Sequence, residues 1–592
     1  MSMIDSASAA AQRWDSDVPA TAAVVVARNS RRLWGFMRGL LLRQRSERTG
    51  KMRGGTAHAV LDNLAVVGIV PHIAQDEQPW RRWLRWLARG TLVGLLLLLL
   101  LIPLENFGGR RAWKQFEAEA NARGEWLDSA AIIPLPVPDA ENFAAIPLFK
   151  PLFDWTNGQV DSHSGLYSTV WRDPEGRDRL DAIHVHGNSI GPMRESARWR
   201  EGRSVDLAAW QAHFRSQTNQ FPAAPQPQTP AADVLLALSK FNVEMGQLHA
   251  AMSRPHARFP IRYENHLAAL LHHPTVLIKF TDIAELRALA ALSENRVEAA
   301  KDDLLLGLRL AAALDGEPLL ISKLVTLRLI ETLMPVLWEG LTRHQWGETQ
   351  LATIEDALGK FDFVVGFQRA IRGERSISTF GAMEALRKYP DLFNDLVKLM
   401  DSDDDNIIMG VLWRLMPSGW LDYNKAYLGQ LYQRLLETAD PAAHRFYLDK
   451  ADALQEEANA DGSPSLRNLN RMMAPMVFPR FGSLPGRCAR AQTTLDLARV
   501  AIALERHRIK HGALPETLDA LAPVFLASVP RDVISGAPLK YQRGDASRFA
   551  LYAVGWNGTD DGGQHARMKG GTPPQIDWRA GDWPWPQPAT KE

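Results

Sequence analysis

Two carboxylates and an amide lie close together near the end of the chain, in the stretch YAVGWNGTDDGG (552–563). Asn557, Asp560 and Asp561 carry the hard oxygen ligands that Ca²⁺ prefers, and the glycines around them allow backbone carbonyls to turn inward. Their spacing is not that of an EF-hand. A glycine-rich turn with solvated acids fits the same residues, so calcium binding and a plain turn both stay open.

Two groups of histidines offer nitrogen ligands or general bases. His184 and His186 are two residues apart, which on a strand places both side chains on one face, as in some metal sites. A pair of exposed histidines is the alternative. His266, His272 and His273 fall in a segment that we expect to be helical. Neither later histidine is three or four residues from His266, so the spacing does not predict a helical metal pair.

The rest of the sequence carries no recognisable catalytic signature. The segment IRGERS (371–376) contains Glu374 and Arg375, for which we expect a buried ion pair or charges on a helix face. The sequence contains no G-x-S-x-G, phosphate-binding loop or H-E-x-x-H motif. With one cysteine, Cys488, the chain can form neither an internal disulfide nor a thiolate zinc site of its own. We therefore expect no catalytic residues, and favour a protein that is not an enzyme.

Length and charge limit the remaining classes of function. The chain has 592 residues, 46% of them hydrophobic, which is enough for several domains with cores of their own. Its formal net charge is +1, so no overall field attracts nucleic acid, and no nucleic-acid partner is predicted.

The strongest single pattern is the run RRWLRWLARGTLVGLLLLLLLIPLENFGG (81–109). Its uncharged part, 90–104, spans about 22 Å as a helix, and the flanking residues extend it toward the ~30 Å of a bilayer core. Trp83, Trp86 and Phe107 suit the two membrane interfaces. We predict a transmembrane anchor over 83–107. A buried helix of a water-soluble protein and a cleaved signal peptide are the alternatives.

Positive charges indicate how this anchor is oriented. Arginines are more frequent before the apolar run than after it, which predicts a cytoplasmic N-terminus and a periplasmic remainder in a bacterial inner membrane. Residues 1–80 are then a basic, partly disordered cytoplasmic tail. Its apolar stripe around Trp34 can also lie on an anionic membrane surface, or translation can begin later, at Met37 or Met52.

The predicted exported part is mainly α-helical. Residues 108–232 read as a juxtamembrane helix followed by a proline-rich mixed region, and 233–465 as an irregular α-helical domain. Within that domain, Ser293–Asn295 separates two apolar stripes that predict an antiparallel helix pair. The pair resembles one tetratricopeptide-type unit, but no second copy follows in register, so a regular solenoid is not predicted.

Residues 466–592 are expected to form a small α+β head. A long helix from about Arg487 to His511 is followed by two short strands, PLKYQR (538–543) and RFALYAVG (548–555). Gly512 is expected to end the helix. The Asp-Trp repeats at Asp577–Trp578 and Asp582–Trp583 are interpreted as clamping the tail onto this head, with binding of a partner as the alternative.

The order of motifs in this head resembles a known family. The helix ending ALERHRIKHGALPETLDAL, then VPRD, GAPLKYQ, FALYAVG and a closing DDGG resemble the globular part of type II secretion major pseudopilins. The resemblance covers about residues 487–563 and implies calcium in the terminal loop. Pseudopilins carry an apolar N-terminal helix directly before the head, whereas this chain does not, so it does not look like a fibre subunit.

The whole predicted exported arrangement is also similar to a family of single-pass membrane proteins common in Verrucomicrobia and Planctomycetes, a resemblance that implies architecture rather than activity. Together these patterns predict a mainly α protein: one transmembrane helix, an irregular helical domain and a pseudopilin-like head. The expected function is that of a membrane-anchored envelope scaffold or interaction protein. Its expected partners are the lipid bilayer and other envelope or secretion proteins. A periplasmic hydrolase with an unrecognised site is the alternative.

Overall fold

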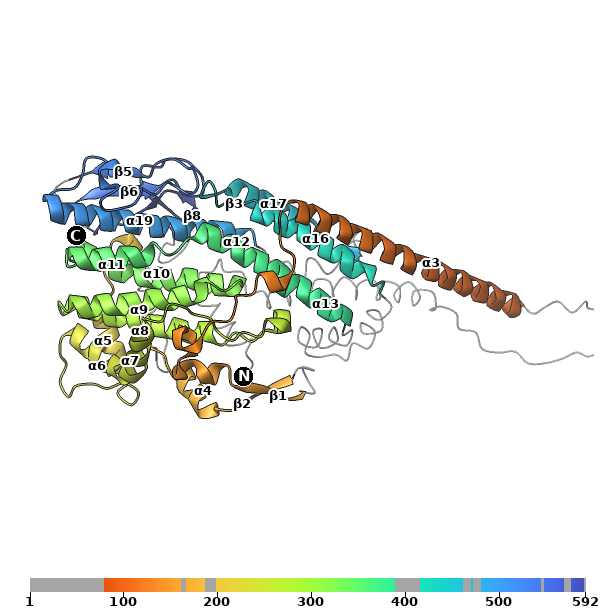
Figure 1. Ribbon diagram of the computed structural model, residues 1–592, viewed down its shortest axis with the longest axis horizontal. Coiled ribbons are helices and arrows are strands. Elements are labelled where there is room, and N and C mark those ends of the chain that lie inside the picture. Colours follow the sequence, from red (N-terminus) through yellow and green to blue (C-terminus); the bar gives the residue numbers. More distant parts are fainter. Residues whose placement is uncertain are drawn as a thin grey trace, which may run out of the picture. The chain divides into compact units, whose positions relative to one another are not determined.

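In a computed structural model, the chain is mainly helical, as its sequence predicts (Figure 1). The structure describes residues 79–160, 167–186, 199–388, 416–461, 470–471, 481–544, 548–568 and 576–589. The predicted cytoplasmic tail, apart from its last two residues, lies outside these ranges. The chain divides into two compact units: the first holds residues 1–119, 385–428 and 459–479, and the second holds 120–384, 429–458 and 480–592.

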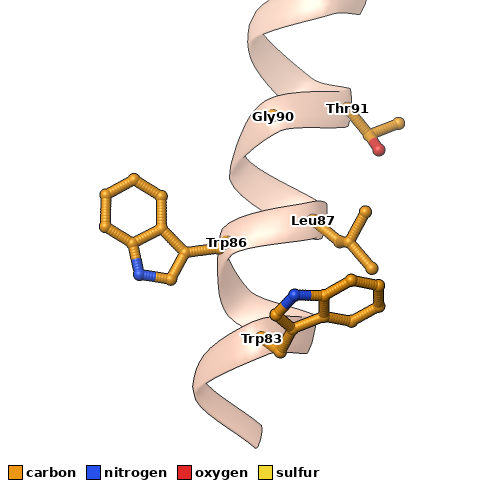
Figure 2. A pocket seen from close by; sticks show the side chains of 5 residues that line it. All are labelled: Trp83, Trp86, Leu87, Gly90 and Thr91. Atoms are coloured by element: carbon orange, nitrogen blue, oxygen red, sulfur yellow. The ribbon is translucent and has the colours of Figure 1, made fainter. Parts of the chain in front are cut away.

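The predicted anchor and the juxtamembrane helix belong to one element, α3 (Pro79–Ala122). Its first half exposes large apolar side chains, with Trp83 68% and Trp86 73% accessible. Figure 2 shows the Trp83 ring beside Leu87 and the Trp86 ring projecting from the opposite side of the helix. Among the residues whose side chains are described, which leave out 95–99, no helix is long and apolar enough to cross a membrane.

Three long helices form the centre of the second unit, and they lie side by side in Figure 1. These are α8 (His273–Ser293), α9 (Val297–Asp315) and α10 (Leu320–Thr342). The predicted helix pair and its turn are confirmed by α8 and α9. Their apolar faces are inaccessible to solvent, and Leu289, Leu304 and Leu333 are each at most 1% exposed.

Shorter elements surround these three helices. They are β1 (Trp155–Val160) and β2 (Tyr167–Trp171), which pair antiparallel, α4 (Pro174–Asp181), α5 (Leu207–Arg215), α6 (Pro230–Leu238), α7 (Asn242–Ala251) and α11 (Glu348–Leu358). The helix α6 begins at Pro230, inside the proline-rich mixed region that the sequence predicts to extend to residue 232. Thr229 accepts a hydrogen bond from the Ala232 amide, and Pro230 occupies the first helical position, where a missing N–H costs nothing.

One stretch that the sequence pattern assigns to a helix begins as a hairpin. The predicted helix DPAAHRFYLDKADALQEEA (440–458) starts with the paired strands β3 (Ala439–Asp440) and β4 (Arg445–Phe446), and only then continues as α17 (Leu448–Asp461). The Asp440 carboxylate accepts hydrogen bonds from the amides of Ala442 and Ala443, which favours a turn over a helix. The preceding segment AYLGQLYQRLLETA (426–439), whose pattern also predicts a helix, is helical as far as Leu436, in α16 (Gly419–Leu436).

The last part of the chain combines a helix with short strands, as predicted. The helix α19 (Ser483–His511) ends at Gly512, whose φ of 74° is the left-handed cap expected there. Strand β5 (Lys540–Arg543) pairs with β6 (Phe549–Ala553), which confirms the predicted hairpin, and β9 (Trp583–Pro584) pairs with β6 on its other side. Two further strands, β7 (His565–Arg567) and β8 (Ile576–Gly581), pair with each other.

The tryptophan-rich tail is clamped, as the repeated Asp-Trp pairs suggest. Trp583 and Trp585 are 4% and 5% exposed. The Trp585 amide donates to the Leu551 carbonyl of β6, and the Trp338 indole N–H of α10 donates to the Pro586 carbonyl. The tail therefore joins the small sheet to the central helices within the second unit.

Candidate functional site

A seven-residue π-helical segment interrupts one helix of the second unit. This segment, η8 (Glu374–Phe380), lies between α12 (Phe363–Gly373) and α13 (Gly381–Lys388) without a break in the helical path. The start of α12 is fixed by Asp362, whose carboxylate accepts from the amides of Val364 and Val365. Because π-helical turns are rare and concentrate at functional sites, we treat the polar groups around η8 as the candidate site.

The carboxylate at the centre of this site is delivered by the end of α3. Gly124 has a φ of 72°, its amide donates to the Asn121 carbonyl, and the Glu125 amide donates to the Ala120 carbonyl. This is the Schellman pattern that ends a helix at a glycine. It turns the chain so that Glu125, three residues after the helix, points back toward α12 and η8.

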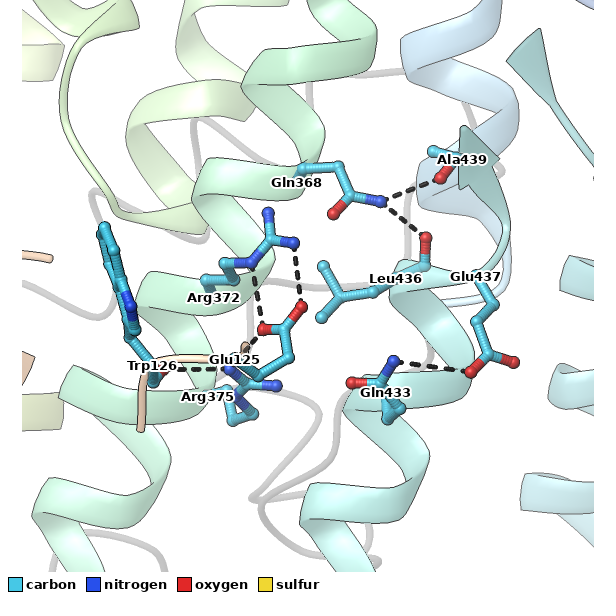
Figure 3. A network of polar contacts seen from close by, with 9 residues as sticks. All are labelled: Glu125, Trp126, Gln368, Arg372, Arg375, Gln433, Leu436, Glu437 and Ala439. Atoms are coloured by element: carbon cyan, nitrogen blue, oxygen red, sulfur yellow. Dashed lines mark hydrogen bonds and ion pairs between the residues drawn. The ribbon is translucent and has the colours of Figure 1, made fainter. Parts of the chain in front are cut away.

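Glu125 binds two arginines that lie three residues apart, on one face of the α12–η8 helix (Figure 3). Arg372 donates from Nε and Nη2 at 3.1 and 2.9 Å, and Arg375 donates from Nη2 at 2.9 Å. Arg375 also donates to the Trp126 carbonyl at 3.1 Å. Of the two residues for which a buried ion pair or helix-face charges were expected, Arg375 forms a buried pair, but with Glu125 rather than Glu374; its side chain is wholly buried and that of Glu125 is 10% exposed.

The pairing decides the charge of Glu125. Burial by itself raises the pKa of this carboxyl, but the hydrogen bonds and positive charges of Arg372 and Arg375 outweigh it and lower the pKa below the usual value. Glu125 is therefore ionised at neutral pH. Burial lowers the pKa of Arg375, and within the described residues its Nε and Nη1 atoms have no hydrogen-bond partner. Arg372 and Arg375 thus share one counter-ion, the carboxylate of Glu125.

Further polar groups, some of them from another element, lie around η8. The Thr379 and Tyr432 hydroxyls are 2.8 Å apart, and Tyr432 comes from α16. Burial, together with the charge of Glu374, raises the pKa of Tyr432 well above its usual value, so the phenol stays protonated. Glu374 retains some exposure, but the loss of water around its carboxyl raises its pKa to about 7.

His266 touches the same segment but not as part of a histidine cluster. It lies in a 3-10 turn, η7 (Tyr263–Ala268), with a left-handed φ of 50°, and its Nδ1 is 3.1 Å from the Ile377 carbonyl of η8. The expectation that His266 lies on a helix shared with His272 and His273 is wrong, because α8 begins only at His273. The ring also packs so close to Gly381 that a Cβ there would meet it at 2.1 Å.

A buried Ser–Glu–His arrangement in the second unit bears on the hydrolase alternative. Ser322 donates to Glu317, and the other Glu317 oxygen is 2.9 Å from His273 Nε2. The carboxylate lies between the serine and the histidine, whereas a nucleophilic serine needs the histidine beside it. All three side chains are almost inaccessible, at 0% for Ser322 and His273 and 5% for Glu317. The arrangement satisfies buried polar groups and does not activate a nucleophile.

The histidine pair at His184 and His186 does not lie on a strand. Both residues follow α4 in an irregular turn and are half-buried rather than exposed. The His186 ring is 5.6 Å from Trp210, and the Gln217 amide donates to the His186 carbonyl at 3.3 Å. Within the described ranges, no group of three or more His, Cys, Asp or Glu side chains is arranged to hold a metal ion.

The oxygens of the terminal loop are occupied by contacts of the protein itself. Asp560 forms an ion pair with Lys540 at 3.0 Å and accepts from the Tyr552 hydroxyl, while Asn557 donates from its amide nitrogen to Asp561 at 2.9 Å. The Asn557 oxygen accepts from the Thr559 amide. These contacts fit a turn.

Calcium binding at Asn557, Asp560 and Asp561 therefore stays a prediction, and the ion pair between Lys540 and Asp560 opposes it. Ca²⁺ must displace the Lys540 ammonium from Asp560, so a Lys540→Ala variant should bind it more readily than the natural chain. If the loop is a calcium site, millimolar Ca²⁺ raises the melting temperature, and the increase is larger in the variant. Equal melting temperatures with Ca²⁺ and with a chelator, in both proteins, would contradict calcium binding.

The Glu125–Arg372–Arg375 network had only a partial signal in the sequence. The IRGERS segment draws attention to Arg375, and the NARGE segment (121–125) marks a helix end, but nothing local relates the two across about 250 residues. No family model, curated protein or solved structure matches the chain.

Proposed function

We propose that this chain is a membrane-anchored envelope protein that acts as a scaffold or interaction protein. The observation that carries the proposal is the first half of α3, where large apolar side chains are exposed on a helix. The exposed residues are Trp83, Leu84, Trp86, Leu87, Leu92, Val93, Leu100, Leu101, Leu104 and Phe107. Such exposed apolar side chains are unfavourable in water and favourable in lipid.

The second half of the same helix has the opposite character. Phe116 and Ala120 are 1% and 0% exposed, so these turns pack against protein. Beyond them, Glu125 attaches the end of the helix to Arg372 and Arg375. This arrangement supports a helix that passes from lipid into a folded domain and is held there by a charged contact.

The described part of the second unit supports a role in interaction rather than in catalysis. Its charged and polar clusters connect elements of the fold, and the Ser322–Glu317–His273 order is unsuited to nucleophilic attack. The resemblance of the C-terminal head to pseudopilins supports proteins of secretion or pilus-like machinery as the partners. The proposed location is the bacterial inner membrane, with the N-terminus in the cytoplasm.

Cysteine labelling tests the anchor and its orientation. The native Cys488 gives little background, because its side chain is wholly buried and burial raises the pKa of its thiol to about 12. We expect an impermeant maleimide to label Ser528→Cys, an exposed site, in intact cells, and Ser6→Cys only after lysis. Labelling of Ser6→Cys in intact cells would overturn the orientation, and release of the protein by alkaline carbonate would overturn the anchor.

Crosslinking in native membranes tests the interaction role. Full-length protein tagged at its C-terminus would be crosslinked, purified and compared with an unrelated tagged single-pass protein of the same membrane. We expect specific recovery of secretion-system or other envelope proteins. If the tagged protein recovers no protein more strongly than the control does, the scaffold role is contradicted. This holds even if the labelling experiment confirms the anchor.

A further inference from the structure

The end of α19 carries two histidines on one face of the helix. His507 and His511 are four residues apart, the spacing that brings two side chains of an α-helix next to each other. Their ring centres are 4.4 Å apart. Two imidazole rings that bind one Zn²⁺ through nitrogens at about 2.0–2.1 Å have their centres about 4.5–5 Å apart. The two rings therefore already lie close to the separation that a shared metal ion requires.

The chain just beyond the helix orients the ring of His507. Gly512 adopts its left-handed conformation and ends the helix, and the Ala513 carbonyl that follows comes back to the last turn. The Nδ1 atom of His507 lies 2.8 Å from this carbonyl oxygen. Because a carbonyl oxygen only accepts, Nδ1 donates, and the neutral ring has its lone pair on Nε2. Metal-binding histidines are oriented in the same way, by a hydrogen bond from the nitrogen that does not bind the metal.

An aromatic side chain supports both imidazole rings. The Phe525 ring lies edge-on to each, with its centre 5.6 Å from that of His507 and 6.2 Å from that of His511. Phe525 is 5% exposed, so its position is set by the packing of the second unit. His507 is half-buried, whereas His511 is exposed. The pair is thus supported from the protein side and open to solvent, where an ion can enter and water can complete its coordination.

The charges around the pair are compatible with a bound cation. Arg506 forms an ion pair with Glu348 and Arg508 forms one with Glu505, each at 2.7 Å, so both guanidinium charges are compensated. The Lys510 ammonium lies over the same phenylalanine ring, 5.6 Å from its centre, and opposes a cation. The last carbonyls of α19 carry partial negative charge and favour one. These opposed effects leave the two ring nitrogens to decide binding.

We propose that His507 and His511 form a binding site for a divalent transition-metal ion of the zinc, copper and nickel class. Imidazole nitrogens suit these ions, whereas Ca²⁺ and Mg²⁺ prefer oxygen ligands. His507 binds through Nε2, and His511, which is exposed, binds through its ring nitrogen. Two protein ligands leave further coordination positions open for water or an exchangeable ligand. The site is therefore distinct in its chemistry from the oxygen-rich terminal loop.

Calorimetric titration with Zn²⁺ tests the site, using the full chain in lipid nanodiscs and without a polyhistidine tag. We expect His507→Ala and His511→Ala each to weaken the tightest Zn²⁺ binding by about tenfold or more, because one of two nitrogen ligands is lost. The matched control is His256→Ala, whose side chain is 50% exposed and which has no histidine four residues away. This control should bind Zn²⁺ as the natural protein does.

Copper gives a second readout at the same place. With one equivalent of Cu²⁺, the electron paramagnetic resonance spectrum should show coupling to two imidazole nitrogens in the natural protein and to one in His511→Ala. His511 is exposed, so this variant is expected to fold even if His507→Ala does not.

Two results would overturn the proposal. The first is an affinity for Zn²⁺, or a Cu²⁺ spectrum, that is the same in His511→Ala and in the natural protein. The second is an equal loss of affinity in His256→Ala and in His511→Ala, which would assign binding to scattered histidines rather than to the pair on α19.

Discussion

Glu125→Gln is expected to lower the free energy of unfolding by about 3–5 kcal/mol, because it leaves two guanidinium groups without their counter-ion. Arg375 is the more severely affected of the two, since its side chain is wholly buried and cannot turn to solvent. The amide keeps the shape of the carboxylate, so the loss reports on charge rather than on packing. Urea unfolding of the purified full chain, followed by circular dichroism, measures it.

A rescue variant separates the buried charge from other effects of Glu125→Gln. In the double variant Glu125→Gln, Arg375→Met, no unpaired cation remains buried at position 375, so most of the lost stability should return. Glu117→Gln, an exposed acid on α3, should change stability by less than about 0.5 kcal/mol. Additive losses in the double variant would show that the pair is not the source of the effect.

Trp585→Ala should destabilise the protein by a similar amount, about 3–5 kcal/mol, through the cavity that it leaves. The indole is 5% exposed, and its ring centre lies 5.7 Å from that of Trp199. The tail around it contacts both β6 and Trp338 of α10, so its loosening should also release the small sheet. Limited proteolysis should then cut the variant between 540 and 589, where the natural chain resists.

An exposed tryptophan provides the matched control for this change. Trp126 has the same side chain but is 65% exposed, so Trp126→Ala should leave unfolding nearly unchanged. Its carbonyl, which accepts from Arg375, is kept in the variant. Two results would contradict the clamp. One is that Trp585→Ala unfolds like the natural protein, and the other is that Trp585→Ala and Trp126→Ala lose the same free energy of unfolding.

The helices and strands that the sequence predicts are those with a strong local pattern. The stripes of α8 and α9, the glycine that ends α19 and the β5–β6 hairpin are each specified by residues within a few positions of one another. The stretch 440–458 shows the limit of this reasoning. Its later residues carry a helical stripe, but Asp440 forms a tight turn with its own neighbours and moves the start of the helix to Leu448.

Part of the candidate site is also readable from the sequence. The buried pairing of Arg375 was expected from the IRGERS segment, and the clamped tail from its tryptophans. Functional roles are a different matter: the anchor, the secretion partners and the calcium loop stay predictions that the experiments above address. Asp560 illustrates why, because a carboxylate offers the same oxygens to Ca²⁺ and to Lys540, and only their relative positions decide between the two.

By itself, the sequence determined the mainly helical class, the apolar segment at 83–107, the helix pair α8–α9 and the hairpin of the head. These depend on periodicity and on glycine, proline and aspartate at particular positions, which act within one or two turns of the chain. Only the tertiary structure decided that Glu125 meets Arg372 and Arg375, that His266 contacts η8, and that the tail reaches Trp338. Such pairings join residues more than a hundred positions apart, so their geometry is set by the packing of the whole unit.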